Sequence, residues 1–229
     1  MKILGLIGGI SWVSTADYYR LINEGINTKM GGLNFSHCII HSFNYATIKK
    51  NNDAQDWDAT FSMVSDACIH LKNSGATAIV LCANTMHVIA ERLENTLDIP
   101  IIHIASATAK AIQEKRIKKV GLLGTKFTME MDFFTSKLAA RDIEAIIPGE
   151  EDREFIHNTI YYELGKGLVL EGTQRRYLAI IESLVQRGAD GIVLGCTEIS
   201  MLVHQRDVVV PVFDTTHIHA EAAIAFSLA

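Results

Sequence analysis

Two stretches of this chain, 75–85 and 188–198, look like copies of one another, and this repeat constrains the fold more than any other feature. The first reads Gly-Ala-Thr-Ala-Ile-Val-Leu-Cys-Ala-Asn-Thr and the second Gly-Ala-Asp-Gly-Ile-Val-Leu-Gly-Cys-Thr-Glu. A short apolar, β-branched run after a glycine is typical of a strand that is buried on both faces of a parallel sheet. Aligned without gaps, Cys82 falls on Gly195 and Ala83 falls on Cys196. The two cysteines are therefore not equivalent.

Two more pairs of segments repeat in the same order along the chain. Residues 5–9 (Gly-Leu-Ile-Gly-Gly) resemble 121–125 (Gly-Leu-Leu-Gly-Thr), and 100–104 (Pro-Ile-Ile-His-Ile) match 211–215 (Pro-Val-Phe-Asp-Thr). Three anchors in one order indicate an internal duplication with a period of about half the chain. Alternating strands and helices predict an α/β fold of two similar lobes, each with a parallel sheet flanked by helices. The carboxyl ends of both sheets are expected to face one active-site cleft.

Some local elements can be predicted from side-chain spacing. We expect Ser14 to cap a helix that runs to about Asn27, and the polar segment 44–56 to be a loop. Helices are also expected over about 86–95 and over 129–140. Residues 165–167 (Gly-Lys-Gly) are expected to form a loop, because glycine favours turns.

Composition excludes several classes of function. The net charge is −5 and no basic cluster occurs, which argues against nucleic acid or an anionic membrane as the main partner. The glycines near the N-terminus lack the dinucleotide-binding spacing, and the four cysteines lack paired CxxC spacing, so neither NAD nor a metal is expected. The apolar N-terminal segment resembles the internal segment 121–125, which favours a core strand over a signal peptide. A cytoplasmic location is therefore expected.

The residues after the two repeated strands suggest a carboxylate site. A loop that leaves a strand and begins a helix presents backbone N–H groups with the positive end of the helix dipole behind them. Asn84 and Thr85 after one strand, and Thr197 and Glu198 after the other, add polar side chains. The same field is expected to lower the pKa of the Cys196 thiol and to favour its thiolate. A thiolate beside a bound carboxylate can remove a proton from the α-carbon or act as a nucleophile.

These motifs resemble the aspartate/glutamate racemase family over essentially the whole chain. The resemblance is carried by Asn84-Thr85-Met86-His87, by Gly195-Cys196-Thr197-Glu198 and by the glycine-rich first strands, and it is nearest to the broad amino-acid racemase branch. It implies a cofactor-independent isomerase, acting on a small amino-acid substrate, in which two thiols flank the α-carbon. It also implies a homodimer and lobes of 1–99 with 209–229 and of 100–208.

The chain departs from the family pattern at one decisive position. The family's first cysteine directly precedes Asn-Thr-x-His, where this chain has Ala83. Cys82 comes one residue earlier and is expected to point to the opposite face of the strand. Water or the Thr85 hydroxyl could complete the second half-reaction, or one enantiomer could be processed much better. A one-thiol lyase resembling arylmalonate decarboxylase and an impaired carboxylate-binding protein are the alternatives.

The predicted site contains one catalytic residue and eight residues near the substrate. Cys196 is the expected acid/base. Ser11 and Thr125 occupy equivalent first-loop positions. Because the arginine that strict aspartate racemases have after the second strand is absent, Lys49, Lys50 and Lys166 are the candidate cations for the substrate side chain. The predicted substrate-binding residues are Ser11, Ala83, Asn84, Thr85, Thr125, Lys166, Thr197 and Glu198.

Overall fold

The computed structural model describes residues 1–229, which divide into two compact units. Unit 1 comprises Met1–Ile104 and His219–Ala229, and unit 2 comprises Ala105–Ile218. This division differs at both boundaries from the expected 1–99 with 209–229 and 100–208. The strands explain the difference: β4 (Ile101–Ile102) pairs with β3 (Ala78–Leu81) in unit 1, and β8 (Val212–Asp214) pairs with β7 (Ile192–Gly195) in unit 2.

Unit 1 is built on a four-stranded parallel sheet in the order β2-β1-β3-β4. Its other strands are β1 (Leu4–Gly8) and β2 (Cys38–Ser42). Its helical segments are α1 (Trp12–Met30), α2 (Tyr45–Asp53), α3 (Trp57–Asn73), the 3₁₀ turn η1 (Thr85–Ile89) and α4 (Ala90–Thr96). The unit boundaries fall within α5 (Ile104–Glu114) and α10 (Thr215–Leu228).

Unit 2 repeats the same arrangement with the order β6-β5-β7-β8. Its remaining strands are β5 (Lys119–Gly124) and β6 (Glu144–Ile146). Its helical segments are α6 (Lys126–Glu130), α7 (Asp132–Ala139), α8 (Glu150–Tyr162), η2 (Leu164–Lys166), α9 (Glu171–Gln186), η3 (Thr197–Met201) and η4 (Gln205–Asp207). The two parallel sheets flanked by helices confirm the predicted fold class.

The strand register matches the repeat seen in the sequence. Gly5 of β1 pairs with Ile79 of β3, and Gly121 of β5 pairs with Ile192 of β7. Ile79 and Ile192 are therefore equivalent within their sheets, and counting forward makes Ala83 equivalent to Cys196. The ungapped alignment of the two stretches is the alignment of the two strands.

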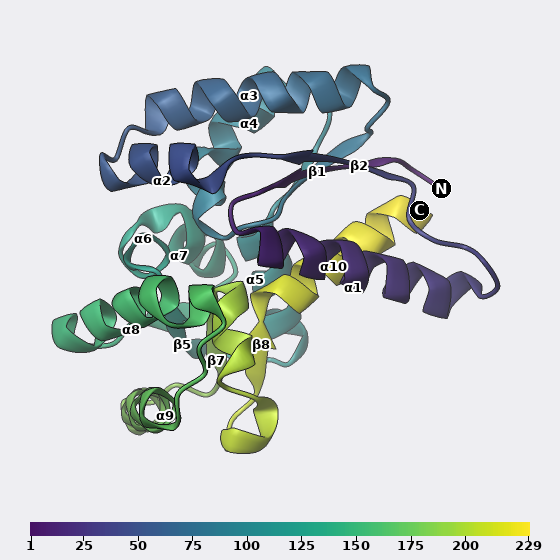
Figure 1. The fold of residues 1–229 in the computed structure, drawn as a ribbon. Coiled ribbons are helices and arrows are strands. Elements are labelled where there is room, and N and C mark those ends of the chain that lie inside the picture. The colour runs from purple at the N-terminus through teal and green to yellow at the C-terminus, as the bar shows by residue number, and fades with distance from the viewer. The chain divides into compact units, whose positions relative to one another are not determined.

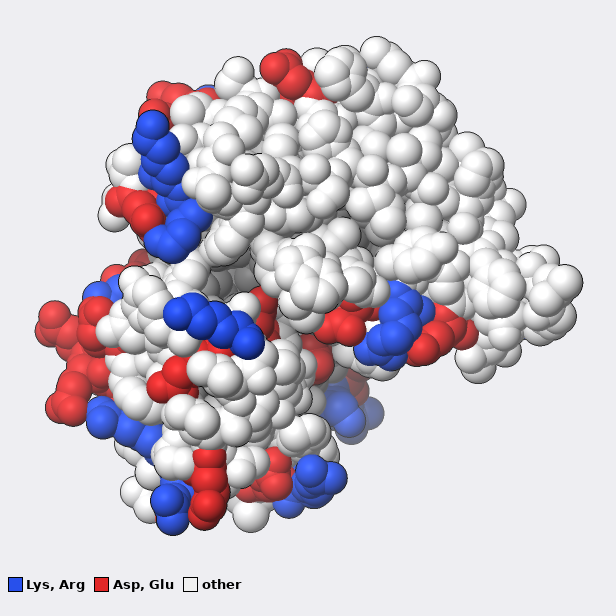
Figure 2. Space-filling model, in the orientation of Figure 1, with Lys and Arg blue, Asp and Glu red and all other residues white.

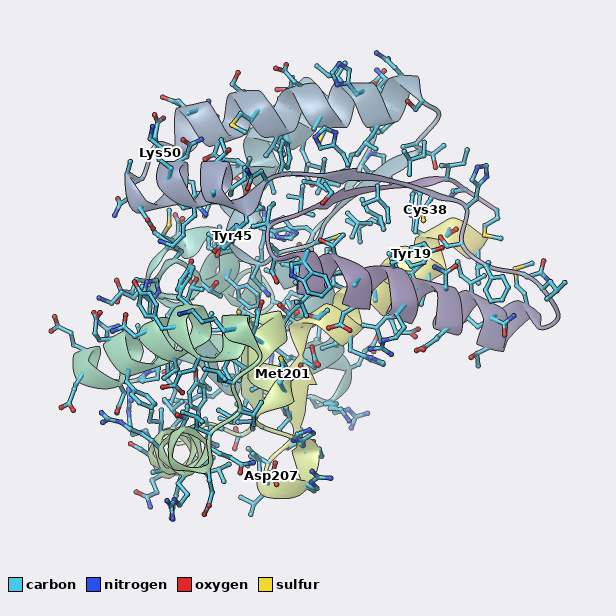
Figure 3. All side chains as sticks on the ribbon, viewed as in Figure 1. Tyr19, Cys38, Tyr45, Lys50, Met201 and Asp207 are labelled. Carbon is cyan, nitrogen blue, oxygen red and sulfur yellow. The ribbon has the colours of Figure 1, made fainter.

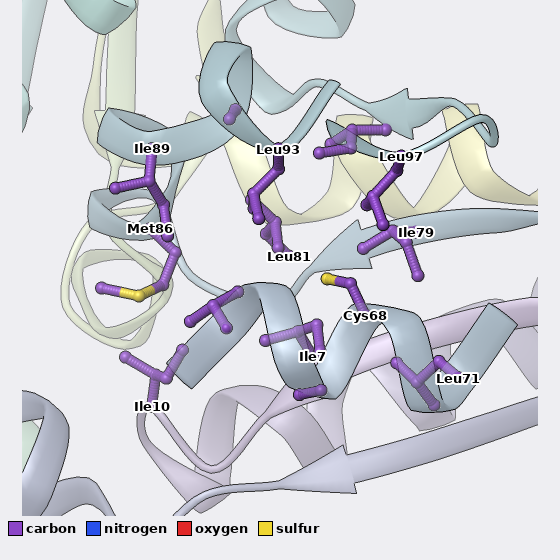
Figure 4. Close-up of a cluster of buried hydrophobic side chains, with 14 of the residues drawn as sticks. Ile7, Ile10, Cys68, Leu71, Ile79, Leu81, Met86, Ile89, Leu93 and Leu97 are labelled. Atoms are coloured by element: carbon purple, nitrogen blue, oxygen red, sulfur yellow. The ribbon is translucent and has the colours of Figure 1, made fainter. Parts of the chain in front are cut away.

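The core of unit 1 lies on both faces of its sheet (Figure 1). Leu4, Leu6, Val80 and Cys82 pack toward α1 and α10. The alternate strand residues pack toward α3, η1 and α4, and Figure 4 shows Ile7, Ile79 and Leu81 beside Cys68 and Leu71. Helices cover both faces of the sheet, so the side chains that point to either face are buried. The central strands are therefore continuously apolar. Each fully buried aliphatic side chain contributes about 2 kcal/mol relative to exposure.

Three local predictions were wrong. Segment 44–56 contains helix α2, because the Asn44 side chain accepts the Ala46 N–H and Ile48 is buried against α3. Ser11, not Ser14, caps α1, since Ser14 is buried and its hydroxyl donates to the Cys82 carbonyl. The predicted loop at 165–167 begins within the 3₁₀ turn η2.

Two predicted helices are interrupted. Residues 85–89 form the 3₁₀ turn η1 before α4 begins, and Met131, with an extended backbone, separates α6 from α7. All four cysteines are free thiols, and no group of three or more His, Cys, Asp or Glu side chains is arranged to hold a metal ion. None of the helices combines the length and the apolar character needed to cross a membrane.

Candidate functional site

Cys196 directly follows the carboxyl end of β7 and precedes the turn η3. Its backbone is still extended, with φ −154° and ψ 138°, so the side chain continues the alternation of the strand. Gly195 comes so close to β5 that a Cβ atom there would lie 2.8 Å from the Leu123 carbonyl oxygen. Glycine at position 195 therefore lets the end of β7, and with it Cys196, lie tightly against the neighbouring strand.

The Cys196 thiol has a carboxylate partner. Its Sγ donates to Glu198 Oε2 at 2.9 Å, and the Thr197 hydroxyl donates to the same oxygen at 2.6 Å. Glu198 is only 8% exposed, so these bonds help to compensate for the burial of its carboxylate. The structure thus brings together the three residues of the Cys-Thr-Glu motif, and makes Glu198 a direct partner of the thiol.

The expected lowering of the Cys196 pKa is wrong. Burial, followed by the negative charge of Glu198 and the hydrogen bond to it, raises the pKa of the Cys196 thiol well above its usual value. The turn behind Cys196 is a five-residue 3₁₀ segment, which supplies a smaller dipole than the α-helix assumed from the sequence. The resting group is therefore a thiol that donates to Glu198, and its thiolate forms only when a base takes the proton.

Thr125 lies next to Cys196 on the adjacent strand. Gly124 of β5 pairs with Gly195 of β7, and Thr125 and Cys196 are the residues that follow them. The Thr125 hydroxyl caps α6 by accepting the Thr128 N–H at 3.4 Å, and the side chain is buried. Thr125 is thus a helix cap at the end of the strand beside the candidate thiol.

Two side chains near this end of unit 2 were not found from the sequence. His157 of α8 accepts the Lys126 N–H at its Nδ1, 3.2 Å away, and so holds the first turn of α6. Tyr177 of α9 is buried, and its hydroxyl forms a hydrogen bond with Thr159. Burial raises the pKa of Tyr177, and the charge of an ionised Cys196 adds to this increase. Neither His157 nor Tyr177 has a local sequence signal, because both reach the site only through the packing of α8 and α9 on the sheet.

In unit 1, the residues after β3 form the corresponding turn. Ala83 is partly buried, whereas Asn84 and Thr85 are buried. The Ala83 and Asn84 carbonyls both accept from Nδ1 of His87, at 3.1 and 3.2 Å. This turn presents no thiol or carboxylate at the position that matches Cys196.

Ser11 and Thr125 play the same capping role with different backbones. The Ser11 hydroxyl accepts the Ser14 N–H, as Thr125 accepts the Thr128 N–H. Ser11, however, has φ +88°, in the region that favours glycine, whereas Thr125 has φ −64°. Such a conformation costs on the order of 1–3 kcal/mol and is held here by bonds from the Thr15 hydroxyl and N–H to the Ser11 carbonyl.

The lysines predicted to bind a substrate side chain take no part in the hydrogen bonds of Cys196 and Glu198. Lys166 ends η2 with its Nζ 5.9 Å from the centre of the Tyr162 ring, and no hydrogen bond joins it to Cys196 or Glu198. Lys49 pairs with Asp53, and Lys50 is exposed on α2 (Figure 3). On the face shown in Figure 2, charged side chains occur in small groups of both signs, without a broad basic surface.

Residues 7–223 match the family model described as Asp/Glu/Hydantoin racemase. The chain is 23% identical over 230 residues to a broad specificity amino-acid racemase of Bacillus subtilis (strain 168), with 99% of each chain covered. A Yersinia pestis structure, provisionally assigned as an Asp/Glu racemase, shares 44% identity with a TM-score of 0.95 over 100% of both chains. An aspartate racemase homologue from Pyrococcus horikoshii OT3 shares 31% identity with a TM-score of 0.88, again over 100% of both chains.

Proposed function

This chain belongs to the Asp/Glu/hydantoin racemase family, and we propose that it is a cofactor-independent racemase of aspartate, glutamate or a related amino acid. The observation that carries the proposal is the hydrogen bond from the Cys196 thiol to Glu198 at the carboxyl end of β7. Racemisation needs a group that removes the α-proton and a way to generate that group at neutral pH. The Cys196 thiol supplies the group, and the Glu198 carboxylate is the proposed acceptor of its proton.

The proposed reaction begins with the transfer of the Cys196 proton to Glu198. The resulting thiolate takes the proton from the substrate α-carbon, and the electron pair of the broken C–H bond stays on the α-carbon as a carbanion. A proton delivered to the opposite face gives the other enantiomer. Ala83 cannot deliver it, so water or the Thr85 hydroxyl has this role in the proposal. The hydroxide or alkoxide that remains is neutralised through solvent by the proton held on Glu198, which restores the starting state.

Substrate binding is assigned to the turns that follow the central strands. Asn84, Thr85 and backbone N–H groups are proposed to hold the α-carboxylate, with Ser11 and Thr125 lining the site. Because the Thr197 hydroxyl is bonded to Glu198, its contribution to substrate binding is assigned to its backbone N–H. Lys166 is proposed to pair with the side-chain carboxylate of an acidic substrate. The relatives named for aspartate, for aspartate or glutamate and for a broad range of amino acids support this class of substrate.

A second candidate function is favoured by Ala83. The residue equivalent to Cys196 has no group that can transfer a proton, which suits a lyase that uses Cys196 alone to protonate a carbanion after decarboxylation. The same residue would also suit a carboxylate-binding protein that has lost catalysis. Both alternatives predict that the α-proton of an amino acid is not exchanged with solvent.

Deuterium exchange at the α-carbon separates these functions. The purified protein is incubated in D₂O with L- and D-amino acids and with an arylmalonate, while ¹H NMR follows the α-proton and a coupled assay follows carbon dioxide. A racemase incorporates deuterium and produces the other enantiomer without loss of carbon dioxide. Carbon dioxide release from the malonate without exchange of any amino acid would replace the proposal by the lyase, and binding without either reaction would replace it by the binding protein.

We further propose a cytoplasmic homodimer. Four free thiols suit a reducing compartment. β2 is an edge strand inside a stretch, 30–48, that contains no Lys, Arg, Asp or Glu, and Ile40 on it is 40% exposed. An edge strand without charges invites pairing with a second chain. Light scattering is expected to give a dimer for the parent and a monomer for Ile40→Lys, and a monomeric parent would contradict the dimer.

A further inference from the structure

Unit 1 buries three histidines behind the turn that follows β3. His87 and His103 have ring centres 4.8 Å apart, and His87 and His219 have ring centres 5.4 Å apart. All three side chains are buried, although imidazole usually prefers at least partial contact with water. The proposed reaction uses none of them, so their burial needs another explanation.

The hydrogen bonds of His87 determine which nitrogen carries the proton. The Ile104 backbone N–H can only donate, and it points at Nε2 of His87 at 3.2 Å, so this nitrogen must accept. Nδ1 lies 3.1 Å from the Ala83 carbonyl oxygen and 3.2 Å from the Asn84 carbonyl oxygen, both of which can only accept. His87 is therefore neutral, with its proton on Nδ1, and that proton is shared between the two carbonyls.

In His219 the two ring nitrogens have the opposite roles. Its Nε2 faces the Ile102 carbonyl and so donates, and its Nδ1 accepts the Tyr18 hydroxyl at 2.7 Å. His87 and His219 therefore hold the chain on both sides of His103, one through the N–H of residue 104 and the other through the carbonyl of residue 102. Burial lowers the pKa of both imidazoles, which keeps the rings neutral at ordinary pH.

The planarity of the peptide bond carries the effect of His87 to the proposed binding groups. In a trans peptide the carbonyl of one residue and the N–H of the next point in opposite directions. The His87 ring holds the Ala83 carbonyl, and it holds the Asn84 carbonyl together with the backbone N–H of His87, which donates to it at 3.0 Å. These bonds fix the planes that contain the N–H groups of Asn84 and Thr85 and point those groups away from the ring. These are N–H groups of the residues that the proposed function assigns to the substrate carboxylate.

We infer that His87 is a positioning residue that orients the Ala83–Asn84 turn for carboxylate binding through its Nδ1 proton. This inference rests on the proposed function for its kinetic consequence. Its structural part, the tautomer and the orientation of the turn, does not depend on any substrate. The two parts can therefore fail separately.

Two isosteric substitutions divide the bonds of the ring. In His87→Asn the amide nitrogen takes the place of Nδ1, so the donor to the carbonyls is kept and the acceptor for Ile104 is lost. In His87→Gln the amide oxygen reaches the place of Nε2, so the acceptor is kept and the donor is lost. His219→Asn is the matched control, because it removes the bond to Ile102 in the same cluster without touching residues 83 and 84.

Kinetics and melting temperatures are measured for all three variants, using the deuterium exchange of the substrate that the parent turns over. His87→Gln is expected to raise KM about tenfold with kcat within about threefold, whereas His87→Asn and His219→Asn keep KM within about threefold. All three variants are expected to melt below the parent. A KM that rises equally in all three, or in proportion to the loss of melting temperature, would show a purely structural role and overturn the inference.

NMR of the free protein tests the structural part without substrate. Histidine ¹⁵N spectra are expected to show His87 protonated on Nδ1, and the amide signals of Asn84 and Thr85 are expected to move in His87→Gln but to stay near their parent positions in His87→Asn. A proton on Nε2, or equal shifts in both variants, would overturn the inference even if the protein racemises amino acids. The expected spectra in a protein that exchanges no amino acid would support the orienting role and reject the proposed function alone.

Discussion

The turns after β3 and β7 occupy equivalent places in two similar units, yet different chemistry holds them in place. In unit 2 the turn begins with Cys196, and its side chain donates to the Glu198 carboxylate two residues later. In unit 1 the turn begins with Ala83, and its backbone carbonyl accepts from the imidazole of His87 four residues later. One copy of the repeat has a thiol bonded to a carboxylate, and the other has an imidazole bonded to backbone carbonyls.

The first-loop residues differ in the same direction. Ser11 and Thr125 both cap the following helix with a hydroxyl, but only Ser11 does so from a backbone with positive φ. The strain in unit 1 is maintained by Thr15, which also accepts the Gly9 N–H at 2.8 Å. The two units thus share a scaffold but differ in the side chains of their turns. The proposed function assigns binding to the turn of unit 1 and proton transfer to the turn of unit 2, and each assignment can be tested separately.

The largest effect is expected when the cysteines of the two units are exchanged for serine. Cys196→Ser should slow deuterium exchange on the order of 10³- to 10⁴-fold, because a serine hydroxyl is a far weaker acid at neutral pH. Cys82→Ser is the matched control and should stay within about threefold, since Cys82 is buried toward α1 and α10. NMR of the α-proton in D₂O gives both rates. If Cys82→Ser were inactive and Cys196→Ser active, the proposal would have assigned the chemistry to the wrong unit.

A smaller loss is expected when Glu198 is replaced by its uncharged isostere. Glu198→Gln should slow exchange on the order of 10²-fold, because Cys196 then lacks a base for its proton. The same change removes the negative charge that helps to raise the pKa of the thiol, so alkylation of Cys196 by iodoacetamide at pH 8 should become faster. Mass spectrometry of the modified peptide measures that rate. If both rates fall together, Glu198 supports the fold of the turn and does not accept the proton.

The stability of unit 1 is expected to depend on pH through its buried histidines. Burial lowers the pKa of His219 from 6.5 to about 4, so between these values the unfolded chain binds more protons than the folded chain. Stability is therefore full above pH 6.5 and falls as the pH drops, by about 2 kcal/mol between pH 7 and pH 5.

Hydrogen exchange of amides in β1 and β3, measured at both pH values and corrected for intrinsic rates, tests this stability. Amides of β5 and β7 in unit 2 are the internal control. His219→Gln, which keeps a donor for Ile102 but cannot be protonated, should reduce the dependence. A pH effect of the same size in His219→Gln would exclude His219 as its source.

The smallest effect is expected from restoring a thiol to unit 1. Ala83→Cys should increase the exchange of the slower enantiomer several-fold if the proposed function is right, because that proposal then gives each face of the α-carbon its own proton donor. Ala83→Ser, which has nearly the same volume but a far weaker acid, should stay close to the parent. The ratio of L-to-D and D-to-L rates, followed by circular dichroism of the amino acid, measures the change. If the ratio is unchanged in Ala83→Cys, residue 83 does not face the substrate.

Much of the architecture could be predicted because the repeated strands have recognisable local sequence patterns. Buried parallel strands are continuously apolar, and glycines flank them, so both sheets and their equivalent positions followed from sequence comparison. Helix α2 was missed because its nine residues are mostly polar, and only Ile48 and Asn52 are buried. The interruptions at η1 and Met131 were missed because a 3₁₀ turn and a single extended residue leave the apolar spacing almost unchanged.

Some features of the candidate site likewise followed from the sequence, and others depended on the tertiary structure. The sequence by itself determined that Cys196 ends one repeated strand, that Ala83 ends the other, and that threonine and glutamate follow the cysteine, because position in a repeat is a property of the chain alone. Only the tertiary structure decided that burial and Glu198 raise the pKa of the thiol, and that Thr197 donates to the same carboxylate. Tertiary packing likewise placed His87 between the Ala83 carbonyl and the Ile104 N–H. Hydrogen-bond direction and desolvation depend on which atoms meet in space, and no local pattern of residues specifies them.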